Sequence, residues 1–220
     1  MIRKSALTIL LAMGCAAAIA GPAVAATIGG EVFGAFSTHS MKDWNDRVVA
    51  QVNQGGGNMD EFGNGYGGGL GVRTWPTSNW MVSATWEPLR VSREEKVSGD
   101  VARLNANAYE ATAGYFFPST SQAKFGLGAG VGYYSLGGEI TSSSSSDVKL
   151  EGTTVGFHLH GLMEWTMRQG VALTANAGYR IAKIKDTKVD NQSATPELAT
   201  DYSGLALRAG VAFYLPRAGQ

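Results

Sequence analysis

The sequence has few charged residues and almost no cysteine. Only 16% of its 220 residues are Asp, Glu, Lys or Arg, against about 25% in ordinary soluble domains. The 18 basic residues are matched by 18 acidic ones, and because nucleic-acid-binding domains carry a basic excess, a nucleic-acid partner is excluded. The single cysteine, Cys15, excludes an intramolecular disulfide and a zinc site built from several thiolates.

Long apolar runs are also missing after the first 25 residues, so no membrane-spanning helix is expected there. The first 25 residues have the three parts of a secretory signal peptide: the basic pair Arg3 and Lys4, the apolar run 6–20, and the small residues Ala23 to Ala25. We expect residues 1–25 to be cleaved and 26–220 to form one mature domain. An alternative is lipidation of Cys15, but the usual leucine three places before it is absent.

The mature chain shows apolar residues at every second position, which is typical of β-strands with two different faces. In residues 125–133, Phe125, Leu127, Ala129, Val131 and Tyr133 alternate with four glycines. The same alternation recurs near 27–38, 66–75, 80–89, 104–117, 155–165, 171–181 and 205–213. This predicts about eight strands of about ten residues, the length that a tilted strand needs to cross a bilayer.

The predicted connections alternate in length. Three are short, at 76–79, 118–123 and 168–170, and carry turn residues. Four are long, at about 39–65, 90–104, 137–149 and 186–202. Short turns at one rim and long loops at the other are typical of outer-membrane barrels.

The composition of the two strand faces favours a membrane barrel over a soluble one. The less apolar face consists mostly of Gly, Ala, Ser and Thr, which is too few charges for a surface in water but suits a narrow lumen. The apolar face has aromatic residues near the strand ends, which predicts two girdles at the bilayer interfaces. The predicted girdle residues are Trp80, Trp86, Tyr109, Phe117, Phe125, Tyr133, Phe157 and Trp165. The alternative is a soluble lipocalin-like barrel with its apolar face inward.

Three segments carry a resemblance to a known family: KFGLGAGVGYY, EGTTVGFHLHGLMEW and YSGLALRAGVAFYLP. Together with the signal peptide, they make the chain resemble the small eight-stranded outer-membrane barrels of Gram-negative bacteria, a group that includes the OmpA transmembrane domain, OmpX and the opacity proteins. The resemblance implies an all-β, eight-stranded, antiparallel up-and-down transmembrane β-barrel in the bacterial outer membrane. It implies outer-membrane lipid and the barrel-assembly machinery as partners, and no cofactor.

One feature departs from that family. Its members often end on an aromatic residue that the assembly machinery reads. In this sequence Phe213 and Tyr214 are followed by LPRAGQ, so the aromatic residues are displaced from the terminus.

The charged residues on the less apolar face are predicted to form a salt-bridge network inside the lumen, because buried charges must be paired or hydrogen-bonded. The predicted set is Glu31, Arg73, Glu87, Glu110, His158, His160, Glu164, Arg180 and Arg208. The alternative is a narrow, polar path for small solutes, with space left by the glycine-rich inner faces of 67–71 and 126–132.

The pair His158 and His160 projects to one strand face, with the residues about 7 Å apart along the strand. It could hold part of a zinc site with Glu164, but one strand supplies too few ligands. We therefore predict no metal and expect these rings to be hydrogen-bonded to Glu110 or Glu164.

No nucleophile elbow, P-loop or dinucleotide motif occurs, so the chain is not expected to be an enzyme. The sequence favours a structural, adhesive or protective barrel, with a narrow porin-like channel as the alternative. A lipid-modifying enzyme is less favoured, since only His39, close to Ser37 and Ser40, lies at a rim.

The first long loop, residues 39–65, is predicted to contain a short amphipathic helix. Ser40 and Asp43 resemble a capping pair, and Met41, Trp44, Val48 and Val52 recur at helical spacing. The favoured interpretation is a lid on the barrel mouth. The alternative is an exposed element that binds a surface ligand.

Overall fold

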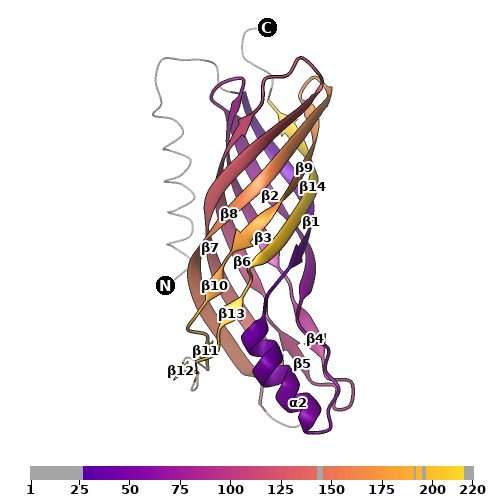
Figure 1. The fold of residues 1–220 in the computed structure, drawn as a ribbon, viewed down its shortest axis with the longest axis vertical. Helices are drawn as coiled ribbons and strands as arrows, with labels where there is room; N and C mark the ends of the chain where they lie inside the picture. The colour runs from indigo at the N-terminus through magenta and orange to yellow at the C-terminus, as the bar shows by residue number, and fades with distance from the viewer. Residues whose placement is uncertain (1–26, 143–145, 191, 195–196, 216–220) are drawn as a thin grey trace.

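The computed structural model describes residues 27–142, 146–190, 192–194 and 197–215, which form a closed β-barrel (Figure 1). Each of its eight long strands pairs antiparallel with the next along the chain, and the last pairs with the first. The strands are β1 (Thr27–Thr38), β2 (Asn64–Trp75), β3 (Trp80–Leu89), β6 (Ala106–Phe116), β7 (Ala123–Thr141), β8 (Val148–Arg168), β9 (Val171–Ile181) and β14 (Gly204–Tyr214). The predicted fold class is confirmed. The predicted signal peptide lies outside the described residues.

The strands are strongly staggered around the barrel. The row of paired residues that starts at Ile28 runs through one residue of every strand and ends at Leu205 of β14. Ala206 pairs with Ser37, so Leu205 lies level with Thr38. The row that starts at Ile28 therefore returns to β1 ten residues further along, at Thr38. Such a stagger in eight strands corresponds to a tilt of about 40° and leaves an interior only wide enough for side chains.

The orientation of the two strand faces decides between lipid and water as the surroundings. Leu127 and Leu205 are 58% and 55% exposed, and the outward positions next to them are also apolar. Charged residues on the opposite face of the membrane strands are buried, for example Arg208 of β14. The soluble lipocalin-like alternative is therefore wrong, because it requires the reverse orientation. Within the described ranges, no helix is long and apolar enough to cross a bilayer.

At the long-loop end, six short strands extend the barrel wall. They are β4 (Ser92–Glu94), β5 (Val101–Arg103), β10 (Lys183–Ile184), β11 (Lys188–Val189), β12 (Gln192–Ser193) and β13 (Thr200–Asp201). β5 pairs with β7, and β11 pairs with β8. The prediction of a loop over 137–149 is wrong, because β7 and β8 continue as a paired hairpin up to Ile140 and Val148. Polar residues such as Glu139 and Lys149 occupy the outward face there, since that part of the hairpin is not in lipid.

The helix predicted in the first loop is present, as η1 (Trp44–Val49) followed without a break by α2 (Ala50–Gln54), near the bottom of Figure 1. η1 has wide, π-type turns. The predicted capping pair is wrong, because no side chain caps the helix start. The Asp43 carboxylate instead accepts the backbone N–H of Ala199 at 3.2 Å, which ties the helix to the last loop.

Glycines on the inner face make room for large side chains from neighbouring strands. A Cβ atom on Gly128 would lie 2.9 Å from the Leu162 side chain, and one on Gly132 or Gly156 would lie 2.8 Å from Tyr134. Large side chains from neighbouring positions therefore occupy the space beside these glycines, so the expectation of open space along 126–132 is wrong.

We expect Gly156→Ala to destabilise the barrel by about 1–3 kcal/mol, because the added methyl overpacks the interior against Tyr134. Gly161→Ala, on the outward face of the same strand, is the matched control, since its methyl would meet only the Ala177 carbonyl at 3.6 Å. Urea unfolding in lipid vesicles measures both. Equal stability of the two variants would contradict this packing.

Candidate functional site: the filled lumen

All nine charged or histidine residues predicted for the lumen lie inside the barrel, and none is more than 7% exposed. Their arrangement is not a single network. Two separate groups of ion pairs lie one above the other along the barrel, and apolar side chains close the lumen on both sides of them.

The group nearer the short turns centres on Arg73. Its guanidinium binds the carboxylates of Glu31 at 2.9 Å and Glu164 at 2.8 Å. The Thr174 hydroxyl donates to Glu31 at 2.6 Å, and the Tyr214 hydroxyl donates to Glu164 at 2.5 Å. Hydroxyl donors from β9 and β14 thus satisfy carboxylate oxygens that one guanidinium cannot cover.

On the short-turn side of this group, the end of the barrel is closed by a small apolar cluster. Trp75, Met81, Phe116 and Leu162 are buried together, and the rings of Trp75 and Phe116 are 4.8 Å apart. The Trp75 indole N–H donates to the Tyr214 hydroxyl at 3.1 Å, which joins the cluster to the ion pairs above it.

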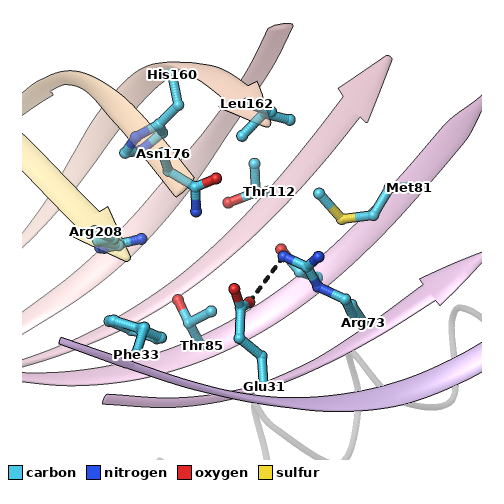
Figure 2. Close-up of a pocket in the computed structure, with 11 residues that line it drawn as sticks. Glu31, Phe33, Arg73, Met81, Thr85, Thr112, His160, Leu162, Asn176 and Arg208 are labelled. Carbon is cyan, nitrogen blue, oxygen red and sulfur yellow. Dashed lines mark hydrogen bonds and ion pairs between the residues drawn. The ribbon is translucent and has the colours of Figure 1, made fainter. Parts of the chain in front are cut away.

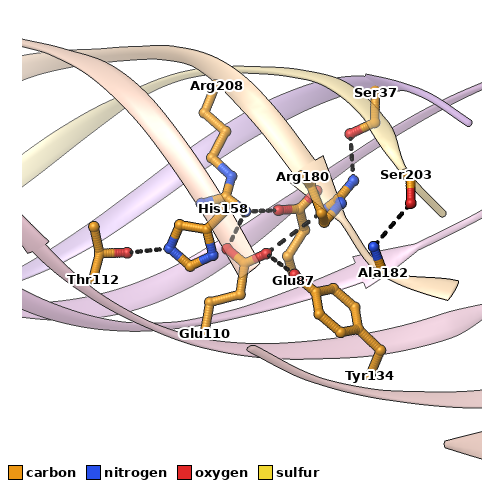
Figure 3. Close-up of polar contacts among 10 residues, drawn as sticks. All are labelled: Ser37, Glu87, Glu110, Thr112, Tyr134, His158, Arg180, Ala182, Ser203 and Arg208. Carbon is orange, nitrogen blue, oxygen red and sulfur yellow. Dashed lines mark hydrogen bonds and ion pairs between the residues drawn. The ribbon is translucent and has the colours of Figure 1, made fainter. Parts of the chain in front are cut away.

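The second group joins two arginines to two glutamates (Figure 3). Arg208 binds both Glu87 and Glu110, and Arg180 lies 3.8 Å and 3.5 Å from the same two carboxylates. The Tyr134 hydroxyl donates to Glu110 at 2.9 Å. Because two positive charges face two negative ones, this group is balanced, which is the condition for burying ions at tolerable cost.

The two histidines lie beside the second group but do not bind its carboxylates. His158 Nε2 is 2.9 Å from the Thr112 hydroxyl, and the His158 and His160 rings meet edge to face at 4.8 Å. The expectation that Glu110 or Glu164 binds these rings is wrong, because both carboxylates are already occupied by arginine and tyrosine. Across the described part of the chain, no group of three or more His, Cys, Asp or Glu side chains could hold a metal ion.

Between the two groups lies a small cavity lined by His160, Thr85, Asn176, Arg73 and Arg208, among others (Figure 2). The space open to the centre of a water molecule is about 10 Å³, which is room for one water. Among the described residues, this cavity between the two groups therefore holds no more than about one water molecule.

On the long-loop side of the second group, the end of the barrel is filled by a large apolar cluster that packs against the helix. Trp44 is fully buried, and its indole N–H donates to the Thr200 hydroxyl at 3.0 Å. Phe62 lies against Trp44, and Tyr202 donates to the Leu104 carbonyl at 2.9 Å. The first loop is thus a lid packed into the barrel mouth, as the favoured interpretation predicts.

Sequence reasoning missed most of the apolar residues inside the barrel. Phe33 and Tyr134 are buried, although the alternation assigns aromatic residues to the lipid face and predicts a polar lumen. A signal for them exists in the sequence, since Phe33 is two residues after Glu31 and Tyr134 is two residues after Gly132 on the inward face.

His39 lies under the lid, just beyond β1, with its ring edge on Tyr202. Burial, helped by the charge of Arg180, lowers the pKa of His39 from 6.5 to about 4; Glu87 lines the same recess. The folded protein thus keeps the ring neutral where the unfolded chain protonates it, so this group reduces stability as the pH falls from 6.5 towards 4.

We therefore expect His39→Gln to lose less thermal stability than the unchanged protein when the pH falls from 7 to 4.5, an interval of ~2.5 pH units that covers most of the pKa shift of His39. Thermal unfolding of both proteins at the two pH values measures the difference. Identical pH dependence in the two proteins would contradict a neutral, buried His39.

The eight predicted girdle residues all lie on the outward face. Trp86, Tyr109 and Tyr133 are paired across neighbouring strands in one row, and the Trp86 indole donates to Asn107 at 3.1 Å. Near the short turns, Trp80 packs on Tyr115 with ring centres 5.3 Å apart. Tyr115 and Tyr66 also face outward and were not predicted as girdle residues.

No protein family and no curated protein matches the chain by sequence. Solved structures match it by fold. The outer membrane protein OprG from Pseudomonas aeruginosa is 14% identical and superposes with a TM-score of 0.59 over 86% of this chain and 95% of OprG. A major outer membrane protein from Thermus thermophilus is 11% identical, with a TM-score of 0.56 over 87% of this chain and all of that one.

Neisserial surface protein A (NspA) gives a TM-score of 0.51 at 15% identity, over 86% of this chain and 96% of NspA. The chain has the fold of the small outer-membrane β-barrels. Two features of the structure agree with this fold. The outward face is apolar, and the eight strands close completely, which lipid requires because it does not tolerate an unpaired sheet edge. In this outer-membrane barrel, the long-loop end corresponds to the cell exterior.

Proposed function

We propose that this outer-membrane barrel is a non-conducting, non-enzymatic membrane component that presents a capped surface to the exterior. The observation that carries the proposal is the filling of the lumen at three levels: the apolar cluster around Trp75, the two groups of ion pairs, and the apolar cluster around Trp44. A solute would have to displace buried charges from their partners, which is costly in a low dielectric.

The exterior surface that remains for a structural, adhesive or protective role is the solvent side of the lid. Lys42, Asp46, Gln51 and Gln54 are exposed there, while Arg47 donates to the Glu197 carbonyl at 2.7 Å and fixes the helix to the last loop. Because the lid is bound on its inner face, any surface ligand would meet a rigid, polar helix face. Its charges are mixed in sign, so no class of ligand is favoured.

A catalytic role receives no support from the placement of the histidines. His158 and His160 are enclosed in the lumen. Ser37, His39 and Glu87 line one recess, but they do not form a catalytic relay. The Ser37 hydroxyl is bound by Arg180 at 3.0 Å, and Glu87 is bound by Arg208.

We expect the purified protein to give no ion current in planar bilayers at high protein load. The measurement needs proof that folded protein is inserted. A gel supplies it, because the folded, unboiled barrel migrates differently from the boiled, unfolded protein. The matched control is Trp75→Gly/Phe116→Gly, which opens only the short-turn level and should also stay silent because the ion pairs remain. Steady single-channel steps from the unchanged protein would overturn the proposal.

One observation favours a second candidate, the lateral passage of small apolar compounds. The β2–β3 ladder contains only five residue pairs, from Leu70–Trp86 to Thr74–Val82. Towards the long-loop end, Pro88 has no N–H to donate, and a recess there is lined by Tyr66 and Pro88 on the outer face and by Gly67, His39 and Glu87 on the inner face. The wall is thus weakest at this point.

Uptake of a small apolar dye into vesicles that contain the protein tests this second candidate. If the passage exists, Pro88→Val should reduce uptake, because it restores a backbone donor between β2 and β3. Ser135→Val, on the outward face of β7 where the ladder is complete, is the control. No uptake by the unchanged protein would remove this candidate.

A further inference from the structure

Two asparagines bind the returning segment of the first loop to the helix of the same loop. The Asn45 amide donates to the Phe62 carbonyl at 2.8 Å and accepts the Phe62 N–H at 2.8 Å. The Asn53 amide makes the same two bonds to Met59, at 3.1 Å and 2.8 Å. An amide side chain has both an acceptor and donors, so it can pair both backbone groups of one residue, as a neighbouring strand would. The helix and residues 59–62 are therefore joined at two points.

The wide turns of η1 explain why both asparagines reach the same segment. In a regular α-helix, residues eight positions apart point about 80° away from each other, at about 100° per residue. The i→i+5 bonds of π-type turns lower the rotation per residue, and η1 covers the first half of the interval between Asn45 and Asn53. The π-type turns thus bring to one side of the helix two side chains that would otherwise diverge.

The loop joins the barrel at two points that lie side by side. The His39 N–H donates to the Gly63 carbonyl at 2.8 Å, so the chain enters and leaves the loop at one place. Met41 follows the entry with a φ of 41°, in the left-handed region that a non-glycine residue adopts only under strain. At the exit, Gly63 has open space where a Cβ atom would lie. The two joins are therefore a strained residue and an unobstructed glycine, close together.

Towards β4 and β5, the returning segment makes polar contacts that can separate without leaving a carboxylate unpaired. Glu95 accepts the Asn58 N–H, but it also accepts two N–H groups of its own turn. It therefore keeps hydrogen-bond donors when Asn58 moves away. Lys96 and Asp60 form an ion pair whose side chains are 52% and 65% exposed, and exposed pairs contribute little to stability.

We propose that residues 41–62 form one cooperative unit, the lid unit, which opens and closes the barrel mouth as a whole while the barrel strands stay folded. Native proteins open locally in contiguous cooperative units of this kind. Opening exposes Tyr202 and His39, which lie under the lid. The inference goes beyond the proposed function and does not depend on whether the lumen conducts, because the ion pairs of Arg73 and Arg208 lie deeper in the barrel.

Hydrogen exchange of single amides, followed by NMR of the folded protein in detergent micelles, tests the proposal. In the unchanged protein we expect the amides of Met59 and Phe62 to show the same protection as those of the helix, and less than those of β6 and β7. Asn53→Ala should lower the protection of the whole lid unit about tenfold, the usual effect of losing two hydrogen bonds. Alanine is the best helix former, so a helix that opened independently would keep or raise its protection in this variant.

The matched control is Gln51→Ala, at an exposed position of the same helix, which should leave the protection of Met59 and Phe62 unchanged. Asn53→Asp retains an acceptor for the Met59 N–H and should lose less protection than Asn53→Ala. Different protection of the helix and of Met59 in the unchanged protein would overturn the proposal. So would a helix whose protection stays the same or rises in Asn53→Ala, since the two parts of the loop would then open separately.

Discussion

Arg208→Ala is expected to lower the free energy of unfolding by about 3–5 kcal/mol, the usual cost of removing one partner from a buried ion group. Arg208 binds Glu87 and Glu110, and all three side chains are almost completely buried. After the change, Arg180 alone would face two carboxylates, from 3.8 Å and 3.5 Å. Equilibrium urea unfolding in lipid vesicles, followed by tryptophan fluorescence, measures the loss.

Two controls separate charge balance from the loss of a long side chain. Arg208→Met/Glu87→Gln removes one charge of each sign and should recover most of the lost stability, because a balanced apolar replacement is often neutral. Arg103→Ala breaks another arginine–glutamate pair, but one that is 42% and 48% exposed, and should cost less than about 1 kcal/mol. If Arg208→Ala were no worse than Arg103→Ala, the lumen would be wet, and the non-conducting barrel would lose its support.

The strands and their faces could be predicted because alternation records which side of a strand meets lipid. Leu127 and Leu205 are placed outward by this pattern alone, and every predicted lumen charge faces inward. The pattern is informative only where the two faces have different surroundings. Beyond the membrane the faces of β7 and β8 are reversed: polar residues such as Glu139 and Lys149 lie outward, and Leu136 and Leu150 are buried inside. The pattern of the membrane strands therefore stops, and the sequence predicts a loop where the hairpin continues.

The pairing of the lumen charges could not be predicted, because the strand face on which a residue lies does not determine which residue it pairs with. Glu31 and Arg73 are on neighbouring strands, but Arg208 of β14 reaches Glu110 of β6 across the lumen. Such contacts depend on the ten-residue stagger, which is a property of all eight strands together. The histidine partners failed for the same reason: Thr112 lies opposite His158 only when the register of three strands is known.

The lid depends most on Trp44, and Trp44→Ala is expected to release it. The side chain is fully buried under the lid, packs against Phe62 and donates to Thr200. Loss of a buried tryptophan costs about 3–5 kcal/mol. The other contacts of the helix outside its own loop include the buried side chain of Val49 and the bonds of Arg47 and Asp43 to the last loop. We expect the loss of the largest of these contacts to open the lid while the barrel stays folded.

Limited proteolysis separates opening of the lid from unfolding of the barrel. The turn after α2 contains Gly55, Gly56 and Gly57 and should become a cleavage site in Trp44→Ala, while the folded barrel keeps its gel migration. Lys42→Ala, at an exposed position beside the same helix, should remain as resistant as the unchanged protein. Resistance of Trp44→Ala would show that the lid is held by the rest of the loop. Cleavage without any ion current would show that the ion pairs of Arg208 and Arg73 close the barrel without the lid, as the filled lumen requires.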